Sequence, residues 1–141
     1  MTARLAPLGD PPTSGGGGER RRKILLVDDS PTVLMMEKMV LAKDLYDVVT
    51  ARDGLDALEK VANEKPDLIL MDVMMPRMDG FEACRRIRSS EGARSVPIIM
   101  VTTRGELNSV ELGYESGCND YITKPINGLE LLAKVKNCLG E

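Results

Sequence analysis

Three aspartates and one lysine of this chain have the types and spacing to do chemistry. They are Asp28, Asp29, Asp72 and Lys124. Each lies where an apolar run ends, and parallel strands that end together bring such residues into one crevice. Carboxylates crowded there would hold a hard cation such as Mg²⁺, and a lysine among them would neutralise a bound anion. This combination suits phosphoryl transfer better than other common chemistry.

A crowded acidic site assigns a different role to each residue. Asp28 and Asp29 are the natural metal ligands, because neighbouring carboxylates repel one another unless a cation lies between them. Asp72 can ligate through one oxygen and attack phosphorus with the other, which forms an acyl phosphate. Lys124 can pair with the developing charge, and the hydroxyl of Thr102 can donate to a phosphoryl oxygen.

Five apolar runs must position these residues. They span residues 24–27, 46–51, 68–71, 98–101 and 120–122. Several are apolar continuously rather than alternately, which is typical of strands covered on both faces. The fifth run is short and more polar, which favours an edge strand.

The stretches between the runs have helical spacing. Ser30, Asp53 and Asp79 can cap the first three helices, and the last helix starts at about Asn127. The stripes expected to face inward are Val33, Met36 and Val40, then Leu55, Leu58 and Ala62, then Phe81, Cys84 and Ile87, and finally Leu132, Val135 and Leu139. The alternation predicts an α/β fold with right-handed crossovers, a doubly wound five-stranded parallel sheet.

Composition allows one domain and little more. The chain has 141 residues, of which 43% are hydrophobic but only 3% aromatic. Residues 1–22 are rich in glycine and proline and predict a flexible tail, so the domain spans residues 23–141. Because aromatic residues are few, we expect methionine side chains to fill the core in their place, among them Met35, Met36, Met39 and Met71. Met74, Met75 and Met78 are expected to be exposed around the site.

Several classes of function are excluded by what the sequence contains. The formal net charge is −3, and the first 22 residues carry more arginine than acidic residues, so residues 23–141 are more acidic still and a poor binder of duplex nucleic acid. Histidine is absent, so any phosphohistidine in the mechanism must belong to another protein. The cysteines Cys84, Cys118 and Cys138 lack CxxC spacing and even parity, which predicts reduced thiols in a cytoplasmic protein. No apolar stretch approaches the roughly 18–20 residues of a membrane span.

Four segments together resemble the receiver domain of two-component response regulators, the CheY-like family. They read LLVDDSP, LILMDVMMPRMDGFEACRRIR, PIIMVTT and YITKPI. The resemblance covers about residues 23–139 and implies the (βα)5 flavodoxin-like topology. It implies that Asp72 is the phosphoacceptor, and that Asp28 and Asp29 hold Mg²⁺ together with the backbone carbonyl of Met74. Lys124 would contact the phosphoryl group.

The same resemblance implies a switch. Thr102 would be the switch hydroxyl and Tyr121 the switch aromatic, acting on the face formed by the fourth helix, fifth strand and fifth helix. Candidate residues on that face are Leu107, Val110, Tyr114 and Tyr121. The family also implies a cis Lys124–Pro125 bond and a loop with Pro76 and Gly80. Residues smaller than Thr103 are frequent at that position in the family, and the family varies at Met74 and Arg104, where the variation resembles a tuning of dephosphorylation.

Each residue also has a plainer interpretation. Asp28 and Asp29 could be turn residues, Thr102 an ordinary strand end and Lys124 a surface lysine. Tyr121 could be a fixed tyrosine on an edge strand. Two other classes of protein also compete: a small-molecule phosphatase, for which we find no cap insertion, and a flavodoxin-like flavin binder, for which no phosphate loop follows the first strand.

The sequence thus predicts a stand-alone receiver rather than an enzyme. Its donor would be a histidine kinase or phosphotransfer protein, and its output would pass through protein–protein contact as a monomer or a phosphorylation-dependent dimer. The alternatives are a receiver fragment of a larger hybrid kinase or multidomain regulator, and an interaction module that works without phosphorylation.

Overall fold

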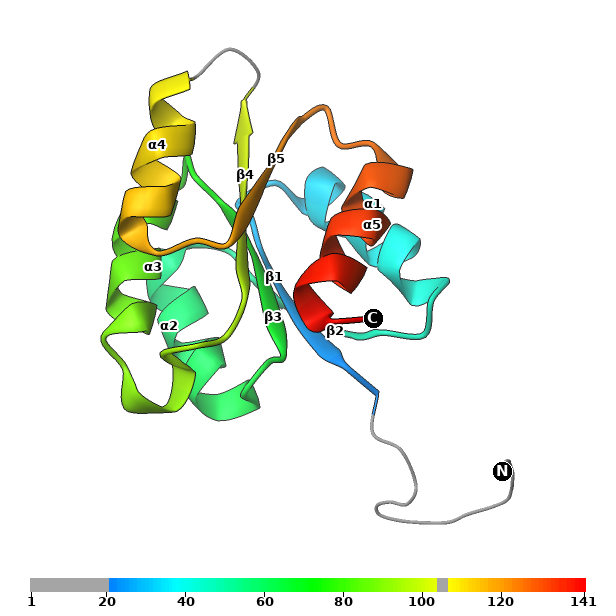
Figure 1. Ribbon diagram of the computed structural model, residues 1–141, viewed down its shortest axis with the longest axis horizontal. Helices are drawn as coiled ribbons and strands as arrows, with labels where there is room; N and C mark the ends of the chain where they lie inside the picture. The colour runs from blue at the N-terminus through cyan, green and yellow to red at the C-terminus, as the bar shows by residue number, and fades with distance from the viewer. Residues whose placement is uncertain (1–20, 104–106) are drawn as a thin grey trace.

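The computed structural model describes residues 21–103 and 107–141, in which strands and helices alternate along the chain (Figure 1). Most of the predicted tail lies outside these residues. The elements are β1 (Lys23–Val27), α1 (Pro31–Ala42), β2 (Asp47–Ala51), α2 (Gly54–Glu64), β3 (Leu68–Asp72), α3 (Gly80–Arg88), the 3₁₀ helix η1 (Glu91–Ala93), β4 (Ile98–Thr103), α4 (Leu107–Ser116), β5 (Asp120–Lys124) and α5 (Gly128–Leu139).

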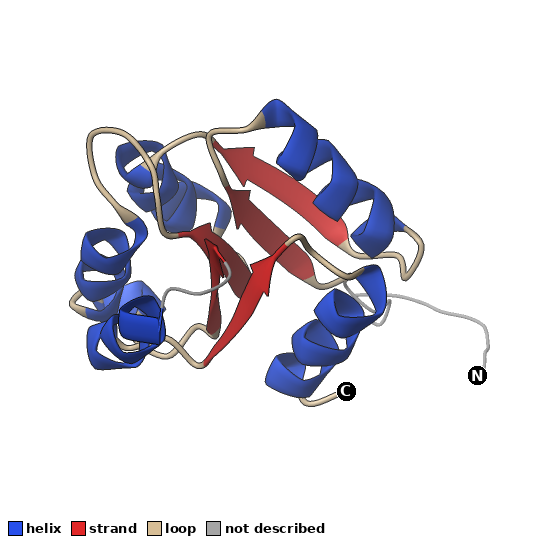
Figure 2. Ribbon diagram, turned by 90° about the horizontal axis from the view of Figure 1, so that it is seen from above, coloured by secondary structure: helices blue, strands red, loops and turns tan. Residues whose placement is uncertain are grey.

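One parallel sheet of order β2-β1-β3-β4-β5 forms the middle layer. Figure 2 shows it as a twisted sheet with helices on both sides. The register places Val27 beside Met71 and Asp72 beside Val101, so β1, β3 and β4 end close together. The doubly wound fold predicted from the sequence is therefore confirmed. In the part of the chain that the structure describes, no helix is long and apolar enough to cross a membrane.

The core divides into one cluster on each side of the sheet. Residues of α2 and α3 pack against one face, and residues of α1 and α5 pack against the other. All five residues of β3 are buried, which explains its unbroken apolar run before Asp72. The central strands thus hold the end of β3 rigidly between two packed layers.

Side-chain caps fix where the helices begin. The oxygens of Ser30, Asp53 and Asp79 accept hydrogen bonds from the backbone N–H three residues further on, as predicted. Asn127 caps α5 in the same way, so that helix starts one residue after the position expected. Each cap lies at the end of a loop that follows a strand, and it therefore also sets the length of that loop at the carboxyl edge of the sheet.

The predicted inward stripes of α1 and α2 lie one position away from the fully buried residues, although Val40 and Leu58 are partly buried and pack against the core. On α1 the buried residues are Leu34, Glu37 and Leu41, whereas Val33, Met36 and Val40 are partly or fully exposed. On α2 they are Gly54, Ala57 and Val61, in place of Leu55, Leu58 and Ala62. Both helices carry apolar residues on more than one face, so periodicity alone does not fix their rotation. On α3 the expected Cys84 and Ile87 are buried, and on α5 Leu131 and Val135 are buried, with Leu132 and Leu139 partly so.

Two expectations about methionine are also wrong. Met35 and Met39 are 64% and 62% exposed, because they lie on the outer face of α1 rather than in the core. Met78 is 8% exposed and packs into the core, whereas Met74 is 65% exposed. Of the four methionines expected to fill the core, only Met71 is fully buried.

The three cysteines are free thiols. Cys84 and Cys118 are buried and Cys138 is partly buried. Burial raises the pKa of all three, and that of Cys118 to about 12. A thiol with a raised pKa is a poor nucleophile, so the chemistry of this fold lies elsewhere.

Candidate functional site

The carboxylates of Asp28, Asp29 and Asp72 meet at the carboxyl ends of β1 and β3. One oxygen of each lies within 4.8 Å of the others. Asp28 and Asp72 are 1% and 4% exposed, whereas Asp29 is exposed. The backbone N–H of Ser30 donates to Oδ1 of Asp28 at 2.9 Å, which orients this carboxylate with Oδ2 turned to the cluster. The site therefore has two buried acidic groups and one open to solvent.

Lys124, the last residue of β5, reaches across this cluster. Its Nζ lies 3.3 Å from Oδ2 of Asp28 and 3.3 Å from Oδ1 of Asp72. Burial alone would lower the pKa of Lys124, but the charges of Asp72 and Asp28 outweigh burial and raise the pKa. The lysine is thus held in its charged form. The peptide bond between Lys124 and Pro125 is cis.

The balance of charge leaves the cluster anionic. Burial, with the negative charge of Asp28, raises the pKa of Asp72 to about 6, while Lys124 opposes this rise. Three carboxylates face one ammonium, so a divalent cation would relieve their repulsion. Oxygen ligands are those that Mg²⁺ prefers. The residues present therefore fit a magnesium ion.

Thr102 presents a buried hydroxyl near the end of β4. The residue is 3% exposed, and within the described residues its Oγ1 has no hydrogen-bond partner. A buried hydroxyl without a partner costs free energy, so Oγ1 has an unused donor for a ligand oxygen. Thr102 follows Val101, which pairs with Asp72 in the sheet.

Tyr121 lies on β5, on the same side of the sheet as Thr102. The register pairs Met100 with Tyr121 and Thr102 with Thr123. The Tyr121 ring is partly buried and makes an edge contact with Tyr114, with ring centroids 6.2 Å apart. The Nζ of Lys134 lies 5.1 Å from the Tyr121 ring centroid. Of the other predicted residues near this face, Arg104 and the side chains of Leu107 and Val110 lie outside what the structure describes.

Backbone hydrogen bonds hold the loop between β3 and α3 in a closed turn beside the end of β3. The backbone N–H of Gly80 donates to the carbonyl of Val73 at 2.9 Å, and that of Met78 donates to the carbonyl of Pro76 at 2.7 Å. A Cβ at position 80 would collide with the carbonyl oxygen of Asp72. Glycine at this position therefore allows α3 to begin directly against the end of β3.

Glu37 is a buried acidic residue that the sequence reasoning missed. It is 2% exposed on the inner face of α1, and its Oε1 lacks a hydrogen-bond partner among the described residues. Burial, with the negative charge of Asp28, raises the pKa of Glu37 to about 8, and Lys124 opposes the rise. Its spacing from Leu34 and Leu41 would have revealed it, had the rotation of α1 been known.

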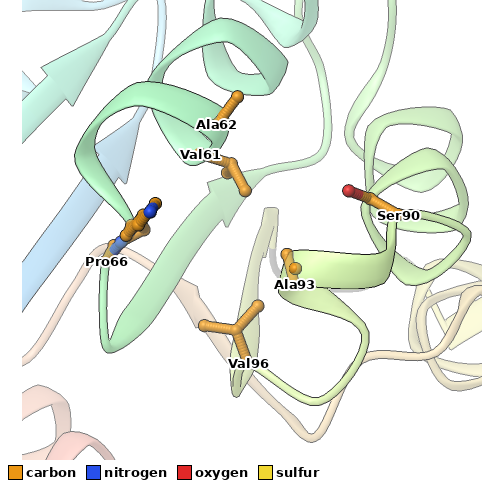
Figure 3. A pocket seen from close by; sticks show the side chains of 8 residues that line it. Val61, Ala62, Pro66, Ser90, Ala93 and Val96 are labelled. Atoms are coloured by element: carbon orange, nitrogen blue, oxygen red, sulfur yellow. The ribbon is translucent and has the colours of Figure 1, made fainter.

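An apolar pocket lies at the opposite end of the sheet (Figure 3). Its volume is about 310 Å³, and Pro66 and Val96, which line it, precede β3 and β4. The other lining residues are Val61, Ala62, Lys65, Ser90, Gly92 and Ala93. Lys65 is the one ionisable residue among them, so this pocket lacks the groups that phosphoryl chemistry needs.

Comparison with known proteins identifies relatives of the whole domain. Residues 24–136 match the family described as the response regulator receiver domain. The chain is 46% identical over 99 residues to the alkaline phosphatase synthesis transcriptional regulatory protein PhoP of Bacillus subtilis, a match that covers 70% of this chain and 40% of PhoP. The chain spans less than half the length of the curated relatives that it matches.

Solved structures agree with this fold. A putative response regulator from Chloroflexus aurantiacus superposes with a TM-score of 0.84 at 36% identity, over 86% of this chain and all of that one. The receiver domain of the sensor histidine kinase PA1611 from Pseudomonas aeruginosa gives a TM-score of 0.80 at 34% identity, over 86% and 100% of the two chains. That structure is described with a magnesium ion coordinated in its active site cleft.

Proposed function

Because this chain belongs to the response regulator receiver domain family, we propose that it accepts a phosphoryl group on Asp72 from a phosphohistidine. The donor is a histidine kinase or phosphotransfer protein, since the 141 residues of this chain include no histidine. The observation that carries the proposal is the position of the Lys124 ammonium, 3.3 Å from a buried Asp72 carboxylate within a cluster of three acids.

The cofactor of this reaction would be Mg²⁺, which Asp28, Asp29 and Asp72 would hold together with the backbone carbonyl of Met74. The close approach of the three carboxylates supports the role of the aspartates, and the magnesium described in the PA1611 receiver domain supports the choice of ion. When bound, the ion neutralises the carboxylates and the incoming phosphoryl oxygens. The charge of Lys124 remains available for the transferred group.

In the transfer step, an ionised oxygen of Asp72 attacks phosphorus and forms an acyl phosphate. The phosphorus–nitrogen bond of the donor breaks, and its electron pair stays on the donor imidazole, which takes up a proton from water. Lys124 pairs with the phosphoryl oxygens, and the unused hydroxyl of Thr102 donates to one of them. The chain would then catalyse only its own phosphorylation and dephosphorylation, as a signalling protein.

The output is a shift between two packings of the face formed by α4, β5 and α5. The hydroxyl of Thr102 moves toward the phosphoryl group, and Tyr121 rotates into the space that it leaves. The Thr102 hydroxyl, which lacks a hydrogen-bond partner among the described residues, and the position of Tyr121 on the same side of the sheet support this coupling. The exposed ring of Tyr114 contacts Tyr121, so it belongs to the surface that changes.

We propose that the chain works as a stand-alone receiver whose partner recognises this face. The alternatives are a receiver within a hybrid kinase, as the name of PA1611 illustrates, or within a multidomain regulator. A blot of source-cell extract, made with an antibody against this domain, separates them. A band at the mass of this chain supports the stand-alone form, and a much larger band contradicts it.

Phosphoramidate tests the transfer, because its phosphorus–nitrogen bond mimics phosphohistidine. We expect the protein with Mg²⁺ to gain a phosphoryl group that hydroxylamine removes, as an acyl phosphate requires. Asp72→Asn should gain none. A hydroxylamine-stable product, or equal labelling of Asp72→Asn, would contradict the assignment of Asp72. No labelling from any donor would favour an interaction module that works without phosphorylation.

A further inference from the structure

An ion pair fastens the loop after β3 to the start of α2. The Nε of Arg77 lies 3.1 Å from Oδ2 of Asp53, and its Nη2 contacts the same oxygen. The other oxygen of Asp53 accepts from the backbone N–H of Asp56 at 2.8 Å. One carboxylate thus serves both as the cap of α2 and as the anchor of Arg77.

The backbone of the same loop rests directly on α2. A Cβ at Gly54 would lie 2.7 Å from the carbonyl oxygen of Met78 and 2.8 Å from its Cβ. The Met78 side chain is buried in the core on this side of the sheet. The loop that begins immediately after Asp72 is therefore attached to α2 at two consecutive residues, Arg77 and Met78.

Arg77 has a backbone conformation that arginine disfavours. Its φ is 69°, in the left-handed region where a Cβ is crowded by the next peptide group. Asparagine or glycine would adopt this conformation more easily, but neither can reach Asp53 as a guanidinium does. The conformation points to the contact with Asp53 as what arginine contributes at this position.

We propose that the Arg77–Asp53 ion pair is a latch that positions the loop carrying Met74, and thereby sets the affinity of the acidic cluster for a divalent cation. The inference rests on the proposed function, because it takes the Met74 carbonyl as a ligand. Arg77 and Asp53 are positioning residues that touch neither the ion nor the phosphoryl group. Without the latch, the loop must be ordered when the cation binds, and that ordering weakens binding.

The test compares Mg²⁺ affinity among variants of the full chain by calorimetric titration. Asp53→Asn keeps a capping side chain but loses the charge that holds Arg77. Arg77→Asn and Arg77→Gly lose the guanidinium while tolerating the left-handed backbone. Exposed ion pairs contribute up to about 1 kcal/mol, so we expect each variant to bind Mg²⁺ about two- to fivefold more weakly. The double variant Asp53→Asn/Arg77→Asn should be no weaker than either single one.

Two further measurements separate positioning from a general structural effect. The rate of phosphorylation by acetyl phosphate should recover at saturating Mg²⁺, and Arg77→Lys should restore part of the affinity. Asp44→Asn is the matched control, because it breaks a different surface ion pair, with Lys136 at 3.3 Å, and should leave Mg²⁺ affinity unchanged.

Wild-type affinity in Asp53→Asn or Arg77→Asn would overturn the latch. If Asp28→Asn still abolished binding in that case, the proposed function would stand without it. Failure of the wild-type chain both to bind Mg²⁺ and to accept a phosphoryl group would instead remove the proposed function, and the latch with it.

Discussion

The ammonium of Lys124 lies 3.3 Å from Oδ1 of Asp72, although their strands are not neighbours. β4 separates β3 from β5, so the lysine reaches over the end of β4 to meet the aspartate. The contact opposes the rise in the pKa of Asp72 that burial and Asp28 cause. It therefore favours the ionised carboxylate that can act as a nucleophile.

Replacing Lys124 tests this relationship. In Lys124→Met the pKa of Asp72 should rise above about 6, and no ammonium would meet the phosphoryl oxygens. We expect phosphorylation by acetyl phosphate to slow by roughly 10²-fold at pH 7, the scale of losing one electrostatic partner in a reacting site. Lys124→Arg keeps the positive charge and should slow phosphorylation less than Lys124→Met does. An unchanged rate in Lys124→Met would show that the lysine plays no part in the transfer.

The buried Glu37 predicts how stability depends on pH without metal. Its pKa is raised from 4.5 to about 8, so the folded state binds more protons than the unfolded state between these values. The free energy of unfolding should therefore fall as pH rises from about 4.5 to 8, by at most ~1.4 kcal/mol per pH unit from this group. Asp72, with its pKa raised to about 6, adds a fall of the same sign at lower pH.

Urea unfolding of Glu37→Gln at several pH values measures this effect. The variant should lose most of the slope between pH 6 and 8, and it should be more stable than the wild type at pH 8. The conservative change keeps the shape of the side chain, so packing changes little. A slope equal to that of the wild type would mean that Glu37 is ionised in the folded protein, contrary to the raised pKa.

Thr102→Val separates signalling from stability. Among the described residues the hydroxyl has no hydrogen-bond partner to lose, so the free energy of unfolding should stay the same or rise by about 1 kcal/mol. Phosphorylation should no longer change the NMR signals of Tyr121, because no hydroxyl moves to make space for the ring. A full Tyr121 response in Thr102→Val would contradict the coupling.

Two glycines test how closely the loop after β3 packs. Gly80→Ala places a methyl group against the carbonyl of Asp72, and we expect it to destabilise the fold by about 2 kcal/mol and to slow phosphorylation. Gly92→Ala is the matched control, because the added Cβ would have no atom within 4 Å among the described residues outside its own helix turn and chain neighbours. Its unfolding free energy should change by less than about 0.5 kcal/mol. Equal effects of the two changes would contradict the packing described.

The sequence predicted most of the fold because strand signals are local. Unbroken apolar runs end beside Asp28, Asp72 and Lys124, and a parallel sheet brings such ends to one edge. The sequence was a poorer guide to which face of each helix is buried. α1 is apolar on its outer face as well, where Met35 and Met39 are exposed, so periodicity gave the wrong stripe and hid Glu37.

The latch was beyond sequence reasoning for a different reason. Arg77 and Asp53 are 24 positions apart, and their contact depends on a left-handed residue within a loop. No periodic pattern in the sequence indicates such a conformation, and an arginine among turn residues is most simply interpreted as an exposed surface residue. Contacts of this kind require coordinates, whereas strand ends require only the order of apolar and acidic residues.

The most direct test of phosphoryl transfer to Asp72 is intact mass spectrometry after incubation with acetyl phosphate and Mg²⁺. The account predicts a gain of one phosphoryl group in the wild-type chain, and none in Asp72→Asn or in the presence of EDTA. A gain that persists in Asp72→Asn would place the modification elsewhere. A wild-type chain that stays unmodified with acetyl phosphate, phosphoramidate and a phosphorylated kinase alike would contradict the assignment of Asp72 as the phosphoacceptor.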